Sequence, residues 1–374
     1  MINGLRMSTS DEYLIRDYEK GEEQEIVQLL KMVFKEWNAR GETALDHWRW
    51  KYEDNPWGGK CAVAVKENKI VAASHDLYLY IKVGDKSEKT VYATDVAVHP
   101  NHRQKGLHTK MQNYRGATTL NFGLRYGYTT NKILIKSTDR RRKKGINPFY
   151  QFPVEVNRYL LIDDVDKHIQ KKKIDYPWIQ KQGYKIKKWM TSKQINQDTE
   201  TSNELIEIKS NLDLNEADLF WDNIKTRYNF ITEKKREYIE WRYLDPRAGN
   251  YQTLSAFRGN EYCGYIVFSI DYETPDYPMG IIIDISTNGE MEVGKILIQK
   301  AITILNESKI NAISAYTVNG SHTSQLLESQ GFIDRGETMY LTYVLPGKYG
   351  KTHPVIENLN AEHVHLMHSD FYVK

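Results

Sequence analysis

The spacing of hydrophobic positions along the chain predicts a protein that combines helices with a sheet. Residues 22–36 have hydrophobic side chains at helical spacing, so that Ile26, Leu30 and Val33 share one face. Further segments typical of strands or helices follow at 61–66, 69–83, 90–98, 106–125, 124–130 and 131–144. This order predicts an α+β (mixed α/β) fold, in which a central, mostly antiparallel sheet is flanked by helices.

The pattern then begins again, which indicates an internal repeat. The segment WKYEDNPWGG, which begins at Trp50, aligns with the segment WRYLDPRAG, which begins at Trp241. The alignment also places Tyr52 on Tyr243. Each segment follows a predicted helix and precedes predicted strands. In the second half the pattern predicts strands and helices in the same order as in the first, at 251–270, 280–286, 293–308, 312–317 and 321–330.

We therefore expect two tandem copies of one domain, over residues 1–164 and 204–346. The segment between them, 165–203, is rich in Lys and Gln and has few aliphatic residues, which is typical of a linker. Residues 347–374 form a C-terminal tail. Because this tail is rich in aromatic residues, we expect it to pack on the protein.

Composition narrows the class of protein. The chain has 52 basic and 49 acidic side chains, and 40% of its residues are hydrophobic, which is typical of a folded, soluble protein and argues against a nucleic-acid coat. Its two cysteines, Cys61 and Cys263, cannot form a disulfide framework or a cysteine zinc site, and both are expected to be buried thiols. The polar N-terminus and the lack of a membrane-spanning run predict a cytoplasmic protein without a membrane partner.

The strongest local signal lies in residues 92–111, YATDVAVHPNHRQKGLHTKM. An alternating strand ends at Val98 and leads through a basic loop directly into a helix. Such a junction leaves backbone N–H groups unpaired at the positive end of the helix dipole, which suits a phosphate or pyrophosphate. Gly106 allows an anion to approach the backbone closely, and Arg103 and Lys105 can supply positive charge.

This segment resembles the acetyl-coenzyme A motif of the GCN5-related N-acetyltransferases (GNAT), in which R/Q-x-x-G-x-G/A follows a V-x-V strand. The resemblance implies acetyl-coenzyme A as co-substrate and no metal. Backbone N–H groups of residues 104–108 would hold the pyrophosphate, and Val96 and Val98 would pair with the pantetheine arm. The coenzyme-binding residues that it implies are Val96, Ala97, Val98, Arg103, Gln104, Lys105, Gly106, Leu107, His108 and Asn131.

Two positions of the first copy depart from the family pattern. His108 replaces the usual small residue, and Arg141 stands where the family often has its general-acid Tyr. The second copy lacks the basic loop: its matching region, about 284–295, contains acidic residues that would repel a pyrophosphate. We therefore expect the second copy to be degenerate and to shape the acceptor site or a subunit contact.

Acetyl transfer to an amine needs a base for the amine and a proton donor for the leaving thiolate. Asp95 on the motif strand is the candidate base. The alternative is that Asp95 fixes a strand bulge or lies exposed on an edge. Tyr128 and Tyr92 are candidate proton donors, although most tyrosines in such strands simply pack. The polarising donor would be a backbone N–H at Val98 or its neighbour, as is usual in the family.

The C-terminal tail holds further candidates. Some tandem members of the family place a C-terminal segment or the terminal carboxylate in the acceptor pocket, and this implies roles for Asp370, His368 and the terminus of Lys374. Together with His363 and His365, His368 could also form a zinc site, an interpretation that we place second to packing of the tail. The basic run 140–144 suits a solvated surface, the coenzyme 3′-phosphate, an anionic acceptor or RNA phosphates.

The sequence thus favours an acyl-coenzyme A-dependent N-acyltransferase that acetylates a primary amine by direct transfer in a ternary complex. An amino sugar is one candidate for the small-molecule acceptor. The alternatives are an aminoacyl-tRNA-dependent transferase of the peptidoglycan-bridge type and a non-catalytic coenzyme A-binding protein. No nucleic-acid motif accompanies the basic run, and a homodimer is left open.

Overall fold

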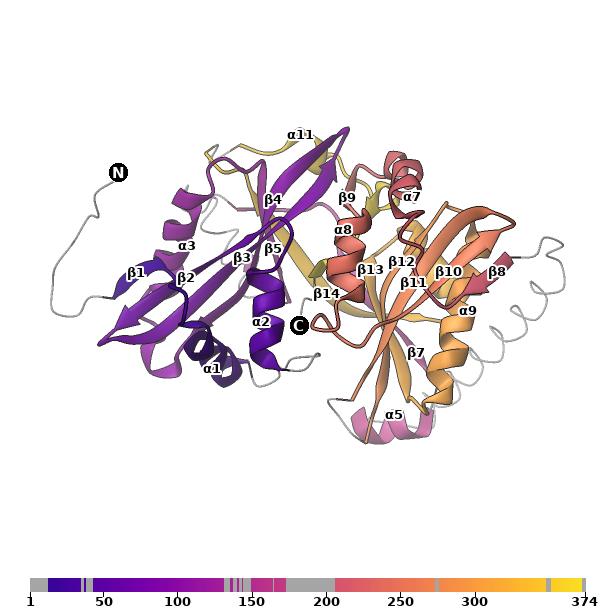
Figure 1. Cartoon of the computed structure of the whole chain (residues 1–374), viewed down its shortest axis with the longest axis horizontal. Helices are drawn as coiled ribbons and strands as arrows, with labels where there is room; N and C mark the ends of the chain where they lie inside the picture. Colours follow the sequence, from indigo (N-terminus) through magenta and orange to yellow (C-terminus); the bar gives the residue numbers. More distant parts are fainter. Residues whose placement is uncertain are drawn as a thin grey trace.

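The computed structural model describes residues 13–34, 37, 43–130, 135–136, 140, 143, 149–163, 165–172, 206–272, 276–347 and 351–371. The predicted mixed α/β fold is confirmed: strands of both halves form one mixed sheet with helices against it (Figure 1). Most of the helix predicted at 131–144, and most of the predicted linker, lie outside the described residues.

The first half follows the predicted order closely. Its helix α1 buries Ile26, Leu29 and Leu30, as the spacing indicated. Thr43 caps the next helix, which ends within the first repeat segment. The elements are β1 (Leu14–Asp17), α1 (Glu23–Val33), α2 (Ala44–Tyr52), β2 (Gly59–Lys66), β3 (Lys69–Val83), β4 (Lys86–Val98), α3 (Leu107–Thr118), β5 (Leu124–Thr129), β6 (Tyr150–Gln151), β7 (Val156–Ile162) and α5 (Val165–Lys172).

The second half repeats this order, with β9 added between α7 and α8 and three short elements added after β14. A π-helical turn over Glu240–Leu244 extends α8 and contains the start of the second repeat segment, WRYL. The elements are β8 (Ile206–Lys209), α7 (Ala217–Ile224), β9 (Phe230–Thr232), α8 (Arg236–Ile239), β10 (Gln252–Arg258), β11 (Glu261–Asp271), β12 (Met279–Thr287), α9 (Met291–Glu307), β13 (Ala312–Val318), α10 (His322–Ser329), β14 (Ile333–Val344), α11 (Pro354–Glu357), β15 (Val364–His365) and α12 (His368–Phe371).

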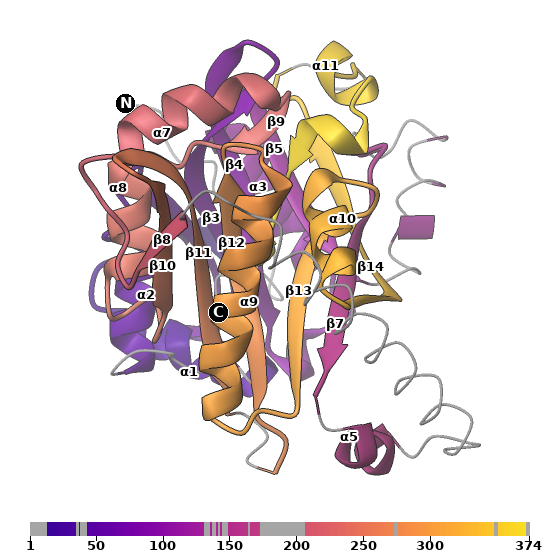
Figure 2. The same cartoon turned by 90° about the vertical axis from the view of Figure 1, so that its right-hand side faces the viewer.

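The two halves exchange strands. The main path of the sheet runs β1-β2-β3-β4-β5-β14-β7-β13-β12-β11-β10-β8. β14 of the second half pairs with β5 of the first, whereas β7 of the first half pairs with β13 of the second. Strands β13, β7 and β14 lie side by side in Figure 2. The order is therefore palindromic, with each half supplying one strand to the sheet of the other, and this supports the internal repeat.

The strand exchange places one strand of the predicted first domain within the sheet of the second half. Residues 156–162 fall inside the predicted first domain, but as β7 they lie between two strands of the second half. The limits at 164, 204 and 346 stay predictions.

Alternation along β2 separates two hydrophobic layers. Ala62 and Ala64 face α3 and pack with Leu107 and Met111. Cys61 and Val63 face the opposite way, into a large core that includes side chains of both halves. A further core in the second half surrounds α9 and contains Cys263. Both cysteines are buried and free, as predicted.

The aligned tryptophans contact each other across the two halves. The Trp50 indole Nε1 donates to the Trp241 carbonyl at 2.8 Å, and the Trp241 Nε1 donates to the Trp50 carbonyl at 3.1 Å. The rings stack with centroids 5.0 Å apart. The contact is thus reciprocal, as expected of two copies related by a local two-fold axis.

Removing either indole N–H should weaken this contact by a similar amount. We expect Trp50→Phe and Trp241→Phe each to lower the free energy of unfolding by about 1–3 kcal/mol, because each leaves a buried carbonyl without its donor. Urea unfolding of both variants measures this. A loss below about 0.5 kcal/mol in either variant, as is usual for surface substitutions, would contradict the symmetric role.

Candidate active site

An opening forms where two central strands of the first half separate. The parallel pairing of β4 with β5 ends at Tyr92 and Tyr126, although β4 continues to Val98 and β5 to Thr129. Gly127 lies at the point of separation, where an added Cβ would stand only 3.3 Å from the Ala93 carbonyl oxygen. Beyond this point the edge of β4 that faces β5 has no ladder partner in β5, so its backbone groups are available to another extended chain.

A cavity of about 720 Å³ occupies this opening. Its walls come from both halves, because the exchanged strand β7 and strands β12 to β14 close the side opposite β4. The lining residues are Phe34, Tyr92, Ala93, Thr94, Asp95, Val96, Tyr128, Thr129, Thr130, Arg158, Asp271, Met279, Ile281, Ser314, Tyr316, Met339 and His368.

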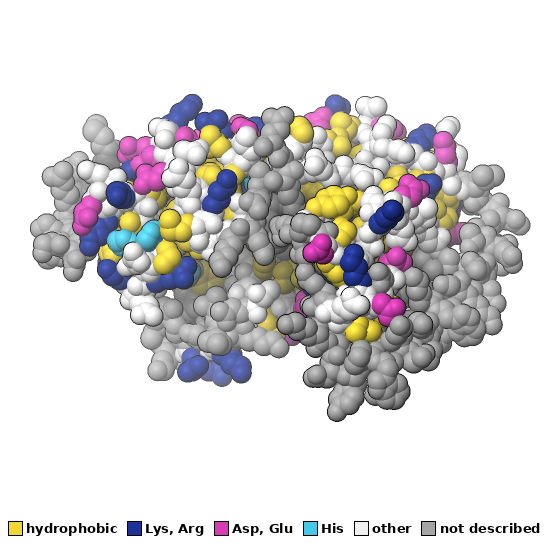
Figure 3. Space-filling view, turned by 90° about the horizontal axis from the view of Figure 1, so that it is seen from below, with side chains coloured by type: hydrophobic (Ala, Val, Ile, Leu, Met, Phe, Trp, Pro, Cys, Tyr) yellow, Lys and Arg dark blue, Asp and Glu magenta, His cyan; other side chains and the backbone are white. Residues whose placement is uncertain are grey.

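The basic loop lies at the far end of β4. Gln104 and Gly106 have left-handed backbone angles, with φ of +63° and +73°, and α3 begins at the next residue without a side-chain cap. A Cβ on Gly106 would meet nothing within 4 Å. Arg103 and Lys105 are exposed. Lys and Arg side chains also gather on the face of the first half seen in Figure 3. The loop therefore presents a helix N-terminus and positive charge to an anion.

The Asp95 carboxylate lines the cavity but is already engaged. Its Oδ2 accepts hydrogen bonds from Lys51 Nζ at 2.7 Å, from the Tyr52 hydroxyl at 2.6 Å and from Trp37 Nε1 at 3.1 Å. Burial alone would raise the pKa of Asp95, but the Lys51 ammonium and these hydrogen bonds hold that pKa well below its usual range. A carboxylate so stabilised in its ionised form is a weak base.

The backbone at Asp95 is also fixed. Its φ of +43° coincides with a register shift between β3 and β4. Trp48 Nε1 donates to Nε2 of His75 at 3.0 Å, so Nδ1 of His75 carries the proton and donates to the Asp95 carbonyl at 2.9 Å. Burial lowers the pKa of His75 to about 4, which keeps it neutral. This arrangement favours the alternative that Asp95 fixes a strand bulge.

The second half contains a counterpart of this carboxylate. Asp284 on β12 is buried and accepts from Lys234 Nζ at 2.7 and 2.8 Å and from the Tyr243 hydroxyl at 2.6 Å. Tyr243 is the residue that the repeat aligns with Tyr52. Burial acts to raise the pKa of Asp284, but the Lys234 ammonium outweighs it and lowers the pKa. The repeat therefore extends from the Trp segment to a buried Asp, Lys and Tyr.

The opening of the second half is filled by the chain itself. The pairing of β12 with β13 also ends early, at Ile282 and Ala315. Beyond that point the C-terminal tail enters: Met367 forms a β-bridge with Thr317, and His365 Nε2 donates to the Ile285 carbonyl at 2.9 Å. The tail thus takes the place in the second half that the cavity occupies in the first.

The structure separates the catalytic candidates. Asp95 and Tyr128 line the cavity, and Tyr128 stacks on Tyr92 at 5.9 Å. Asp370 does not line it: its carboxylate is buried and accepts from the Thr232 hydroxyl at 2.6 Å and from the Met367 N–H at 2.8 Å. His368, which was a secondary candidate, lines the cavity and lies 5.8 Å from the Tyr316 ring.

The predicted coenzyme-binding residues lie on β4, in the basic loop and first turn of α3, or outside the described residues. Val96 lines the cavity, and Ala97 and Leu107 are buried in the hydrophobic layers. Residues 103–106 form the exposed loop, followed by His108 in the first turn of α3. Asn131 lies outside the described residues, as do most of the basic run 140–144 and the terminus of Lys374.

Sequence reasoning missed the wall that the second half contributes, including Arg158, Ser314 and Tyr316. No local pattern marks these residues, since they reach the cavity only through strand exchange. Lys51 could have been identified from the sequence, because the repeat aligns it with another basic residue, Arg242.

Among the described residues no three His, Cys, Asp or Glu side chains converge on a metal site. Within the part of the chain that the structure describes, every helix is too short or too polar to traverse a bilayer.

Comparison with known proteins supports the resemblance found in the sequence. Residues 14–117 match the family model described as "Acetyltransferase (GNAT) domain". This match includes β4, the basic loop and most of α3. No curated protein matches the chain in sequence. The GNAT resemblance is therefore confirmed for residues 14–117, and the tandem layout stays a prediction.

Solved structures extend the likeness to the whole fold. A Saccharomyces cerevisiae N-myristoyltransferase with bound myristoyl-CoA and inhibitors has a TM-score of 0.63 at 11% identity, covering 99% of this chain and 88% of that one. A probable N-acyltransferase from Enterococcus faecalis has a TM-score of 0.58 at 9% identity, with 90% and 73% covered. A GCN5-related N-acetyltransferase from Anabaena variabilis has 0.56 at 12%, with 89% and 72%. At such identities the likeness concerns the fold.

Proposed function

We propose, from the GNAT domain over residues 14–117, that this protein is an acyl-coenzyme A-dependent N-acyltransferase whose reaction takes place in the cavity beside β4. The observation that supports this best is the separation of β4 from β5 after Tyr92. It leaves a strand edge without a partner, beside a cavity and in line with an open helix N-terminus. An extended thioester with a pyrophosphate at its other end matches these three features.

The residues present fit the coenzyme. The N–H groups of residues 104–108 would hold the pyrophosphate, assisted by Arg103 and Lys105. The backbone of Val96 and Val98 would pair with the pantetheine arm, which brings the thioester to the middle of the cavity. The far wall of the cavity includes the apolar residues Met279, Ile281 and Met339. We therefore include acyl groups longer than acetyl among the proposed substrates.

We assign the proton transfers to two residues of the cavity. Transfer forms a bond between the acceptor nitrogen and the thioester carbonyl carbon and breaks the carbon–sulfur bond. His368 takes the proton that the acceptor amine loses, and Tyr128 gives a proton to the departing thiolate. We prefer His368 over Asp95 as the base because Lys51 already neutralises Asp95. Asp95 acts as a positioning residue that fixes the bulge of β4 beside the thioester.

The acceptor is a primary amine, with an amino sugar as one candidate. The aminoacyl-tRNA alternative has no support among the described residues. A non-catalytic coenzyme-binding protein would bind the coenzyme in the same place, so binding and turnover have to be measured separately.

A charged side chain in the loop should remove coenzyme binding. In Gly106→Glu the new carboxylate would stand where the pyrophosphate binds. The space around Gly106 admits the side chain, and the strain of a side chain at φ +73° is shared by the control variant below. We expect acetyl-, octanoyl- or myristoyl-coenzyme A to bind the wild type in calorimetric titrations and to bind Gly106→Glu at least about 100-fold more weakly, an electrostatic loss of roughly 3 kcal/mol.

Gly259→Glu is the matched control. Gly259 also has a positive φ, +58°, and open space around it, but it lies in the β10–β11 turn of the second half. This control should bind like the wild type, and both variants should show similar thermal unfolding. Failure of the wild type to bind any acyl-coenzyme A, or equal binding by the two variants, would overturn the proposed site.

A further inference from the structure

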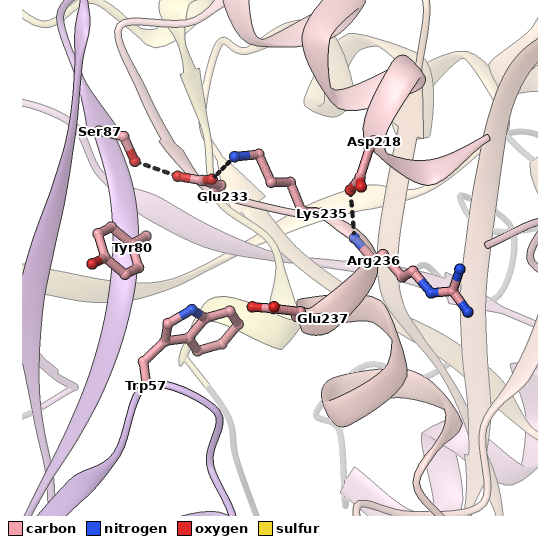
Figure 4. Close-up of a pocket in the computed structure, with 8 residues that line it drawn as sticks. All are labelled: Trp57, Tyr80, Ser87, Asp218, Glu233, Lys235, Arg236 and Glu237. Carbon is pink, nitrogen blue, oxygen red and sulfur yellow. Dashed lines mark hydrogen bonds and ion pairs between the residues drawn. The ribbon is translucent and has the colours of Figure 1, made fainter. Parts of the chain in front are cut away.

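A second cleft, of about 550 Å³, lies between the two halves (Figure 4). It shares no lining residue with the cavity beside β4. The first half contributes the turn after α2 and the hairpin of β3 and β4, and the second half contributes α7 and the start of α8. The lining residues are Trp57, Tyr80, Ser87, Asp218, Glu233, Lys235, Arg236 and Glu237.

One wall of the cleft is a fixed aromatic surface. The Trp57 ring stacks on Tyr238, with centroids 6.0 Å apart and planes inclined by 30°, and meets Trp241 edge-on. The Trp57 backbone N–H donates to the Asn55 side chain at 3.1 Å. The indole therefore has little freedom, and it is directed into the cleft together with the Tyr80 ring (Figure 4).

The three carboxylates around the cleft differ in their partners. Asp218 accepts a hydrogen bond from the Arg236 backbone N–H at 2.9 Å. Glu233 is hydrogen bonded to Ser87 and ion-paired with Lys235 at 2.5 Å. The Arg236 guanidinium extends away from the cleft and pairs with Glu240 at 3.0 Å. The carboxylate of Glu237, by contrast, points toward Trp57 (Figure 4) and has no partner among the described residues.

We propose that this cleft binds an organic ammonium group. An ammonium over the face of Trp57 is attracted by the ring quadrupole, Tyr80 supplies a second aromatic wall, and Glu237 supplies the counter-charge. The Lys235 ammonium remains paired with Glu233 and so repels such a ligand less than a free cation would. Because the cleft and the cavity share no residue, this site is independent of the proposed acyl transfer.

Two probes of the same shape test the role of charge. Choline and 3,3-dimethyl-1-butanol differ only in that a quaternary nitrogen is replaced by carbon. In titrations of the full-length protein without coenzyme, followed by the indole N–H resonance of Trp57, we expect choline to shift this signal with saturation at millimolar concentration. The neutral alcohol should bind at least about 5-fold more weakly, the change that an exposed charge contact supports.

Variants on one helix locate the charge. Glu237→Gln should weaken choline binding about 5-fold and bring it close to the binding of the alcohol. Glu240→Gln, three residues further along, should have no effect, because Glu240 is paired with Arg236 and does not line the cleft. Trp57→Leu should abolish binding, and its thermal unfolding shows whether the stack on Tyr238 was needed for folding.

Equal affinity for choline and the alcohol, equal effects of the two Glu variants, or no shift of the Trp57 signal would each overturn the proposal. Tighter binding of a neutral monosaccharide than of choline would also overturn it, in favour of a sugar subsite. None of these measurements involves acyl-coenzyme A, so failure here leaves the test with Gly106→Glu unaffected.

Discussion

Replacing His368 by glutamine is expected to lower kcat by about 10²- to 10⁴-fold, the usual contribution of a positioned general base. His368 lies on the wall of the cavity opposite β4 and is only 6% exposed. Glutamine keeps a polar side chain of similar size but cannot take a proton from the acceptor amine. Because the loop before α3 is untouched, binding of acyl-coenzyme A should stay within about 2-fold of the wild type.

The tail offers a matched control for this variant. His363 lies five residues earlier and is exposed, with its Nδ1 2.8 Å from the Asn360 side chain. His363→Gln should keep the activity of the wild type. The measurement is steady-state release of free thiol with the amine acceptor that an acceptor screen identifies. If His368→Gln retained kcat within about 3-fold, or if both variants lost activity equally, His368 would not be the base.

The second large effect concerns stability, at the buried pair in the second half. The side chains of Lys234 and Asp284 are 1% and 0% exposed. Lys234→Met should lower the free energy of unfolding by about 3–5 kcal/mol, because it leaves a buried carboxylate without its counter-charge. Lys225→Met, which breaks a surface pair with Asp222, should cost less than about 1 kcal/mol. Chemical unfolding monitored by circular dichroism compares the two.

A double variant keeps this prediction testable if Lys234→Met does not fold. Lys234→Met combined with Asp284→Asn removes both charges and should recover part of the lost stability. No recovery would mean that the loss came from packing around Lys234 and not from the uncompensated carboxylate. A loss below about 1 kcal/mol in the single variant would show that the pair contributes no more than a surface ion pair.

The same pair makes stability depend on pH. The pKa of Asp284 is lowered in the folded protein, so the unfolded chain binds a proton more readily. The stabilisation is complete above the unfolded pKa of about 3.9 and is lost as the pH falls through the lower folded value. The pKa of Asp95 is also lowered in the folded protein, so its contribution to stability is lost in the same way as the pH falls. Acid unfolding of the wild type should therefore be steeper than that of the double variant.

Local patterns in the sequence predicted the central helices and strands of each half, but not β7, β14 or the elements of the tail. Helical spacing located α1, α9 and α10, and the Trp50 and Trp241 segments indicated the repeat before their contact was known. Period-two alternation shows which face of a strand is buried, but not which strand lies beside it. Because β7 and β14 were not among the predicted segments, and because alternation does not identify a strand's neighbour, the sequence analysis did not predict their exchange.

In the candidate site, too, the residues of a local motif were predictable from the sequence, whereas contacts between distant segments were not. Gly106 and its basic neighbours form a continuous motif, so the loop was recognisable from the sequence. Asp95 was correctly placed on the motif strand, but the cation that neutralises it comes from α2, distant in sequence. Asp370 and His368 are two residues apart in the tail, and only the path of the tail decides that His368 faces the cavity while Asp370 is buried.

The exchanged strands also constrain how the chain can fold during synthesis. β5 needs β14 as its neighbour, and more than 200 residues separate Leu124–Thr129 from Val344. The sheet of the first half therefore stays incomplete, with an exposed edge, until β14 has left the ribosome. The loop that must close is long and the contact is non-local, which slows folding. Residues 365–367, which close the opening of the second half, follow β14 in the chain, so this opening is closed later than the sheet of the first half is completed.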